Sequence, residues 1–184
     1  MTTPLDIAVL VGSLRKDALS RKTALALAKL APASLKLKIV EIGALPLYDQ
    51  DLDVAPPASW VAFRIAVNAS KGVLFVTPEY NRSVPAPLKN AIDVGSRPYG
   101  QSAWSGKPGG VVSISPGALG GFGANHHLRQ SLVFLDVPVM QQPEAYLGGV
   151  GTWFDEAGEL QDESARGFLQ KFIDAYAVWV KRHA

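Results

Sequence analysis

The sequence predicts an α/β protein whose parallel sheet is covered by helices on both faces. Three apolar runs of strand length, residues 7–11, 72–77 and 111–114, alternate along the chain with segments of helical composition or periodicity. Strand, helix and strand in regular alternation is typical of parallel sheets, because a parallel partner is reached through a crossover connection. A length of 184 residues fits one domain, residues 1–184, with a substantial core. The sequence contains no cysteine, so this core forms without disulfides.

The first half of the chain begins with a strand at residues 7–11 and an alanine-rich helix that ends before Pro32. Residues 35–42 start with apolar and basic residues in alternation, which predicts an outer strand with one solvated face. Residues 44–52 are acidic and contain proline, which favours a surface connection. Helical spacing then predicts a helix between residues 57 and 70 whose buried side is formed by Trp60, Phe63 and Val67.

The second half continues the alternation after the apolar strand at residues 72–77. Pro85 and Pro87 suit the first turn of a helix that buries Leu88, Ala91 and Ile92. Trp104 is interpreted as a packing residue before the strand at residues 111–114. Asn125 is expected to cap the next helix, which should direct inward Leu128, Leu132, Val133 and Leu135. Residues 137–140 should open the fifth strand, and the last helix, about 162–181, should pack on the sheet through Phe168, Phe172, Tyr176 and Trp179.

The stretch Gly12 to Ser20, Gly-Ser-Leu-Arg-Lys-Asp-Ala-Leu-Ser, links the first strand to the first helix. It has the parts of a phosphate site, because helix N-termini offer backbone N–H groups and Ser13, Arg15 and Ser20 add donors. It matches neither the nucleoside triphosphate loop nor the Gly-x-Gly-x-x-Gly fingerprint. A second interpretation stays open, in which Ser13 or Ser20 only caps the helix.

Two further loops follow strands three and four. Carboxyl ends of parallel strands lie at one edge of the sheet, so residues 78–93 should open onto the same crevice as the stretch 12–20. Residues 115–125 contain four glycines, which either bring backbone close to a flat ligand or form a flexible lid.

Composition excludes several classes of function. A net charge of +2 and the absence of like-charge blocks argue against a nucleic-acid partner. Neither a secretory signal nor an apolar run of membrane-spanning length is visible, so we expect a cytoplasmic protein without a membrane partner. His126 and His127 are neighbours without a carboxylate at ligand spacing, so no metal site is predicted.

With these loops assembled, the sequence resembles the NADPH-dependent FMN reductase family, and within it the branch of bacterial quinone and chromate reductases. The resemblance spans nearly the whole chain. It rests on Gly-Ser-Leu-Arg-Lys at 12–16, Thr-Pro-Glu-Tyr-Asn at 77–81, Ser-Val-Pro at 83–85, Leu-Lys-Asn-Ala-Ile-Asp at 88–93, Ser-Gly-Lys-Pro at 105–108 and His-Leu-Arg-Gln at 127–130.

The resemblance implies a flavodoxin-like, three-layer fold with a five-stranded parallel sheet in the order 2-1-3-4-5, with FMN as cofactor and NADPH or NADH as electron donor. It implies that Ser13, Arg15 and Ser20 hold the FMN phosphate and that loops after strands three and four border the flavin ring. The implied cofactor-binding residues are Ser13, Leu14, Arg15, Lys16, Ser20, Pro78, Glu79, Tyr80, Asn81, Ser115, Pro116 and Gly117. The family usually has asparagine where Ser20 stands.

The implied reaction is a two-electron transfer by hydride through flavin N5 to quinone-like acceptors, with chromate, azo or other xenobiotic compounds as further candidates. Because the cofactor supplies the chemistry, no catalytic residue is assigned, and Glu79 is expected to accept hydrogen bonds from loop amides. Several relatives carry arginine at the position of Gly123, and the absence of that arginine here favours quinones over chromate. Arg82 is either a substitute positive charge or an exposed arginine without such a role, and the second interpretation is favoured. Relatives form dimers or tetramers, so a homo-oligomer is expected.

Two alternatives belong to other classes. A non-enzymatic FMN electron carrier of the flavodoxin type would be strongly acidic, which this slightly basic chain is not. A binding module that holds another phosphate ligand without turnover would lack a yellow chromophore.

Overall fold

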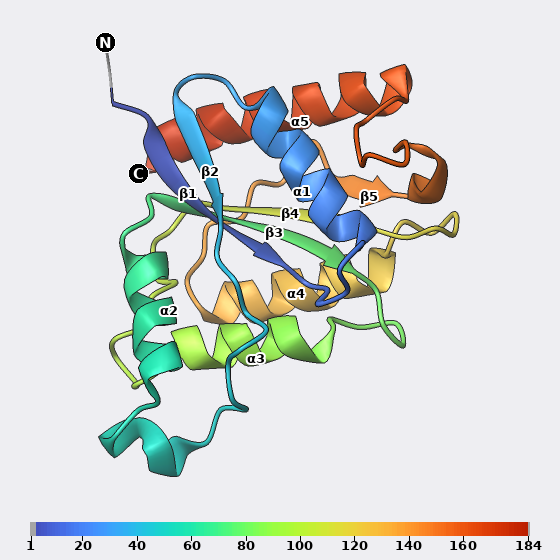
Figure 1. Ribbon diagram of the computed structural model, residues 1–184. Coiled ribbons are helices and arrows are strands. Elements are labelled where there is room, and N and C mark those ends of the chain that lie inside the picture. Colours follow the sequence, from blue (N-terminus) through green and yellow to red (C-terminus); the bar gives the residue numbers. More distant parts are fainter. Residues whose placement is uncertain (1–2, 184) are drawn as a thin grey trace.

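The computed structural model describes residues 3–183 and shows a five-stranded parallel sheet between two layers of helices (Figure 1). Its strand order is β2-β1-β3-β4-β5, as predicted. The strands are β1 (Leu5–Val11), β2 (Leu35–Ile39), β3 (Gly72–Pro78), β4 (Gly109–Ile114) and β5 (Ala145–Leu147). The helices are α1 (Leu19–Leu30), α2 (Ala58–Asn68), α3 (Ala86–Gly95), α4 (Phe122–Phe134) and α5 (Glu163–His183).

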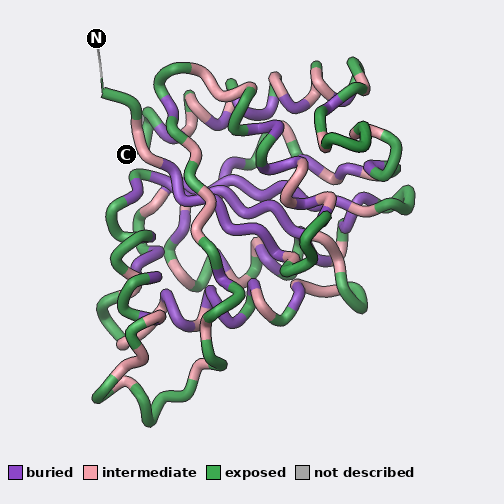
Figure 2. The backbone as a smooth tube through the Cα atoms, in the orientation of Figure 1, coloured by how far each residue is buried: buried purple, intermediate pink, exposed green. Residues whose placement is uncertain are grey.

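Two hydrophobic cores lie on opposite faces of the sheet. Helices α1 and α5 cover one face, and α2, α3 and α4 cover the other (Figure 1). The central strands β1, β3 and β4 are the most deeply buried part of the chain (Figure 2). Trp60, Trp104 and Tyr176 are fully buried, which confirms their expected packing role. No helix among residues 3–183 combines the length and apolar character needed to cross a membrane.

The register of the sheet brings two loops to one place. Strand β1 pairs with β3 from Ile7 opposite Gly72 to Val11 opposite Val76, so both strands end side by side. The chain places β2 on one side of β1 and then β3 on the other side. The ends of β1 and β3 therefore form the switch point, which is where open α/β sheets bind ligands.

Three details of the prediction are wrong. The fifth strand is Ala145–Leu147, and Val139 forms only an isolated bridge with Gly109. Helix α4 begins at Phe122, so Asn125 lies inside it, fully buried and donating through Nδ2 to Ser113 Oγ at 3.1 Å. Val133 is exposed, because Leu128 and Leu132 define the buried side of α4 and the next residue along the helix points about 100° away from it.

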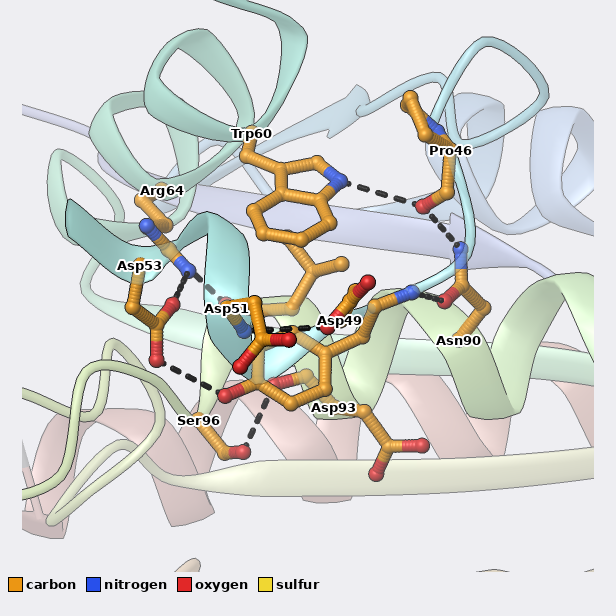
Figure 3. A network of polar contacts seen from close by, with 11 residues as sticks. Pro46, Asp49, Asp51, Asp53, Trp60, Arg64, Asn90, Asp93 and Ser96 are labelled. Carbon is orange, nitrogen blue, oxygen red and sulfur yellow. Dashed lines mark hydrogen bonds and ion pairs between the residues drawn. The ribbon is translucent and has the colours of Figure 1, made fainter. Parts of the chain in front are cut away.

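The segment between β2 and α2 is held against α2 and α3 by hydrogen bonds (Figure 3). It contains a short 3₁₀ helix, η1 (Gln50–Val54). The carbonyl of Pro46 accepts from Trp60 Nε1 at 3.1 Å and from Asn90 Nδ2 at 3.0 Å. Asn90 Oδ1 accepts from the Tyr48 backbone N–H at 2.8 Å.

An ion pair closes the same network at its other end. Tyr48 Oη donates to Asp53 Oδ2 at 2.8 Å, and Asp53 Oδ1 lies 3.5 Å from Arg64 Nη2 (Figure 3). Arg64 Nε donates to the Val94 carbonyl at the end of α3 at 2.9 Å. The acidic segment, expected to be a surface connection, is thus bonded through its polar groups to helices α2 and α3.

Candidate functional site

The β1–α1 loop, residues 12–18, starts with a close approach between the ends of β1 and β3. The Gly12 N–H donates to the Val76 carbonyl at 2.9 Å. A Cβ added at Gly12 would lie 2.5 Å from Thr77 Oγ1 and 3.1 Å from Pro78 Cδ. Only glycine fits there without displacing β3, so this residue brings the two loops together.

No side chain caps the N-terminus of α1. Ala18 is the N-cap residue, Ser20 lies within the helix, and Ser13 Oγ accepts instead from the Arg15 N–H at 3.3 Å. The interpretation in which Ser13 or Ser20 only caps the helix is therefore wrong. The positive end of the helix dipole lies directly beside the loop.

Ser20 carries an unsatisfied polar atom. The residue is 1% exposed, and its Oγ has no hydrogen-bond partner among residues 3–183. A buried hydroxyl without a partner costs about 1 to 3 kcal/mol, and such atoms in native proteins point to a ligand, water or ion. Ser20 faces the cleft described next.

A cleft of about 690 Å³ opens where the β1–α1 loop meets the loops after β3 and β4. Its polar groups lie at the β1–α1 loop, and prolines and a tyrosine form much of the remaining wall. It is lined by Gly12, Ser13, Leu14, Arg15, Ala18, Leu19, Ser20, Pro78, Glu79, Tyr80, Pro85, Ala86, Pro87, Ile114 and Pro116.

Glu79 uses its carboxylate to join the β3 loop to the start of α4. Its side chain is 14% exposed; Oε2 accepts from the Ala124 N–H at 3.1 Å, and Oε1 lies 3.3 Å from Arg82 Nη1. The expected donors to Glu79 are loop amides; the amide it accepts from instead belongs to the first turn of α4. Acidic groups are stabilised at such a helix start.

A tight turn follows, and it fixes the orientation of Tyr80 at the cleft. The backbones of Tyr80 and Ser83 exchange two hydrogen bonds of 3.0 Å. Asn81 and Arg82 between them have φ angles of 50° and 62°, in the left-handed region. Two such residues in a two-residue turn form the type I′ geometry.

Most of the predicted site residues meet at this cleft, and some do not. Those that line it are Ser13, Leu14, Arg15, Ser20, Pro78, Glu79, Tyr80 and Pro116. Lys16 lines two neighbouring clefts, Asn81 lies in the turn, and Ser115 Oγ accepts from the Gly117 N–H at 3.0 Å within its own loop. Pattern analysis assigns no site role to Ala86 and Ile114, because small and apolar wall residues look like core residues in a sequence.

The glycine-rich loop after β4 has a structural cause. Gly120 has φ of 58°, and a Cβ there would lie 2.4 Å from the carbonyl carbon of Tyr146. Gly121, with φ of 72°, precedes α4 as its N-cap residue. These glycines therefore let the loop pack against β5, which neither sequence interpretation of the loop anticipated.

The neighbouring histidines take part in separate polar contacts. His127 Nδ1 lies 3.0 Å from Ser83 Oγ, and His126 Nε2 lies 3.1 Å from Tyr146 Oη. Burial, together with the Glu144 carboxylate, raises the pKa of Tyr146 to about 12. Residues 3–183 contain no cluster of three or more potential His or carboxylate metal ligands.

Comparison with known proteins agrees with this geometry. The profile of NADPH-dependent FMN reductases matches residues 5–151. A quinone reductase of Pseudomonas putida is 65% identical over 182 residues, covering 98% of this chain and 97% of the relative. A 2-hydroxy-1,4-benzoquinone reductase of Burkholderia is 48% identical over 177 residues, covering 96% and 97%. The solved structure of FerB, a flavoenzyme NAD(P)H:(acceptor) oxidoreductase from Paracoccus denitrificans, has a TM-score of 0.92 and 41% identity, covering 97% and 98%.

Proposed function

This chain belongs to the NADPH-dependent FMN reductase family, and from that membership we propose that it reduces quinone-like compounds. As a family member it is an enzyme that uses FMN and takes electrons from NAD(P)H. The proposed acceptor class rests on the names of the relatives from Pseudomonas putida and Burkholderia, which are quinone reductases. Membership in an enzyme family also displaces the carrier and binding-module alternatives.

The residues of the cleft fit FMN. The buried Ser20 Oγ has no partner, and the Arg15 side chain makes no hydrogen bond or ion pair with other described residues. An unused hydroxyl and an unused guanidinium beside an uncapped helix start suit a phosphate. The proline and tyrosine walls suit a flat ring, as ligand sites usually combine apolar walls with a few polar groups.

We assign the phosphate of FMN to Ser13, Arg15 and Ser20, with Leu14 beside them. Pro78, Glu79, Tyr80 and Pro116 border the ring, with Asn81, Ser115 and Gly117 as neighbours in the same loops. Bound FMN would supply the redox chemistry, a two-electron transfer by hydride through flavin N5 from a nicotinamide to a quinone, which with two protons would become a hydroquinone. The protein binds and orients the reactants, and Glu79 remains engaged with Ala124 and Arg82 rather than transferring protons.

Quinones and similar planar organic compounds rank above chromate as acceptors in this proposal. A Cβ at Gly123 would lie 2.7 Å from the Arg82 carbonyl oxygen and 2.9 Å from Glu79 Oε2, so this backbone has no room for a larger side chain there. The cleft walls are dominated by apolar groups, which favour a planar organic acceptor over an oxyanion.

We also propose that the protein forms a homo-oligomer. Several large apolar side chains are fully open to solvent, including Val54 at 94% and Tyr99 at 86%. A subunit interface would cover such groups. Light scattering on the purified protein tests this, and a mass of one chain, 19.6 kDa, would contradict it.

An anaerobic absorbance titration tests the function. The purified, FMN-loaded protein is titrated with NADPH or NADH, and a benzoquinone is then added. We expect the flavin absorbance to bleach in one two-electron step and to return with the quinone. Bleaching by neither nicotinamide, or failure to bind supplied FMN, would contradict the proposal.

A further inference from the structure

A second cleft adjoins the FMN cleft on the other side of the β1–α1 loop. It has a volume of about 520 Å³ and lies between this loop and residues 39–43 at the end of β2. Ser13, Leu14 and Arg15 line both clefts, so one wall is common to them. No part of the proposed FMN site uses this second space.

The polar side of the second cleft carries uncompensated positive charge. Its charged residues are Arg15, Lys16, Arg21 and Glu41. Arg21 Nη2 contacts both oxygens of Glu41, at 2.7 and 2.6 Å, so these two neutralise each other. Arg15 is assigned to the FMN phosphate, whereas Lys16 is exposed and its side chain is not paired with another residue within 3–183. Lys16 is therefore the cation of the second cleft that remains for a further anionic ligand.

Part of the wall of the second cleft is apolar. Leu14 is 55% exposed, and a Cβ at Gly43 would lie 3.2 Å from Leu14 Cδ2, so the leucine rests on this glycine. Val40 and Ile42 extend this apolar part. An apolar wall together with an unpaired lysine matches a nucleotide, whose base is flat and apolar on its faces and whose phosphates are anionic.

We propose that the second cleft binds the adenosine 2′-phosphate end of NADPH, with Lys16 as the residue that contacts the 2′-phosphate. A phosphomonoester carries nearly two negative charges at neutral pH, and NADH lacks this group. The inference rests on the proposed function, in which a nicotinamide nucleotide delivers electrons to the adjoining FMN cleft. Because the two clefts adjoin at Ser13, Leu14 and Arg15, one NADPH molecule would reach across the rim of this loop from Lys16 to the FMN cleft, and Lys16 would make NADPH the preferred donor.

Calorimetric titration of the FMN-loaded protein without turnover tests this. The probes are 2′,5′-ADP, which carries the 2′-phosphate, and 5′-AMP, which does not. We expect 2′,5′-ADP to bind more tightly, and Lys16→Gln to weaken it about tenfold while leaving 5′-AMP unchanged, because one charge-assisted contact is lost. Added salt should weaken 2′,5′-ADP more than 5′-AMP.

Lys22→Gln is the matched control. It removes the same charge six residues further along the chain. Both lysines line the groove beside Gly158, but only Lys16 also lines the second cleft. Equal binding of the two probes, an equal loss in both variants, or competition by inorganic phosphate at the concentration of 2′,5′-ADP would each overturn the proposal. Quinone reduction by the same preparation separates these outcomes from failure of the proposed function, because activity would persist when only the second cleft is misassigned.

Discussion

Two polar connections leave the same edge of the sheet and differ in how their polar groups are used. In the segment between β2 and α2, Asn90 is bonded on both sides of its amide, and the two atoms without a hydrogen bond, Asp53 Oδ1 and Arg64 Nη2, form an ion pair at 3.5 Å. At the β1–α1 connection, neither Ser20 Oγ, in the first turn of α1, nor the Arg15 side chain has any partner among the described residues. Polar groups that pair with one another serve the fold, whereas groups left without either kind of partner are available to a ligand.

The largest expected effect is a loss of stability when the ion pair of the β2–α2 segment is broken. Arg64→Ala leaves the Asp53 carboxylate without its ion-pair partner; the two side chains are only 13% and 18% exposed. Removing one member of a buried pair should lower the free energy of unfolding by about 3 kcal/mol. Urea unfolding measures this loss. The control is Lys89→Ala, which removes the exposed ion-pair partner of Asp93 and should lower the free energy of unfolding by less than about 0.5 kcal/mol. Equal losses would show that the network contributes nothing special.

The next largest expected effect is on FMN binding at the β1–α1 loop. Arg15→Ala should weaken FMN binding by about 1.5 to 3 kcal/mol, because it removes a charge-assisted phosphate contact. The stability of the FMN-free protein should stay unchanged, since Arg15 has no partner among residues 3–183 to lose. Flavin fluorescence titration gives the affinity, and unchanged affinity would remove Arg15 from the site.

Ser20→Ala sharpens the comparison, because its two effects should have opposite signs. Removing a buried hydroxyl without a partner should stabilise the FMN-free protein, while losing a phosphate donor should weaken FMN binding by about 1 kcal/mol. Thermal unfolding with and without FMN measures both. A lower melting temperature without FMN would mean that Ser20 Oγ has a structural partner.

The smallest expected effect is a pH dependence of stability that arises from Tyr48 in the β2–α2 segment. Burial, and next the hydrogen bond to Asp53, raise the pKa of Tyr48 above its ordinary value of 10.0. The unfolded chain therefore loses this proton first, and stability falls as the pH rises above 10. The decline should be shallower in Tyr48→Phe than in the parent protein. Parallel curves from urea unfolding at pH 9 to 11 would contradict the assignment.

The predicted elements that match the structure are those with a strong local signal. Continuous apolar runs mark β1, β3 and β4, and helical spacing identifies the buried side of α2 through Trp60, Phe63 and Val67. The start of α4 is misplaced because Gly121, not a polar side chain, precedes it. Strand β5 is misplaced because a three-residue strand has too short a pattern to distinguish it from residues 137–140.

The sequence by itself determined the alternation of strands and helices, the family and the loops proposed to bind the cofactor, because these depend on local composition and motif spacing. Only the tertiary structure decided which side chains of those loops meet. Lys16 stands next to Arg15 in the sequence, yet it lines the clefts beside the proposed FMN cleft rather than that cleft itself. The orphaned Ser20 hydroxyl and the tight fit of Gly123 likewise depend on distant residues, whose positions are set by packing rather than by neighbours along the chain.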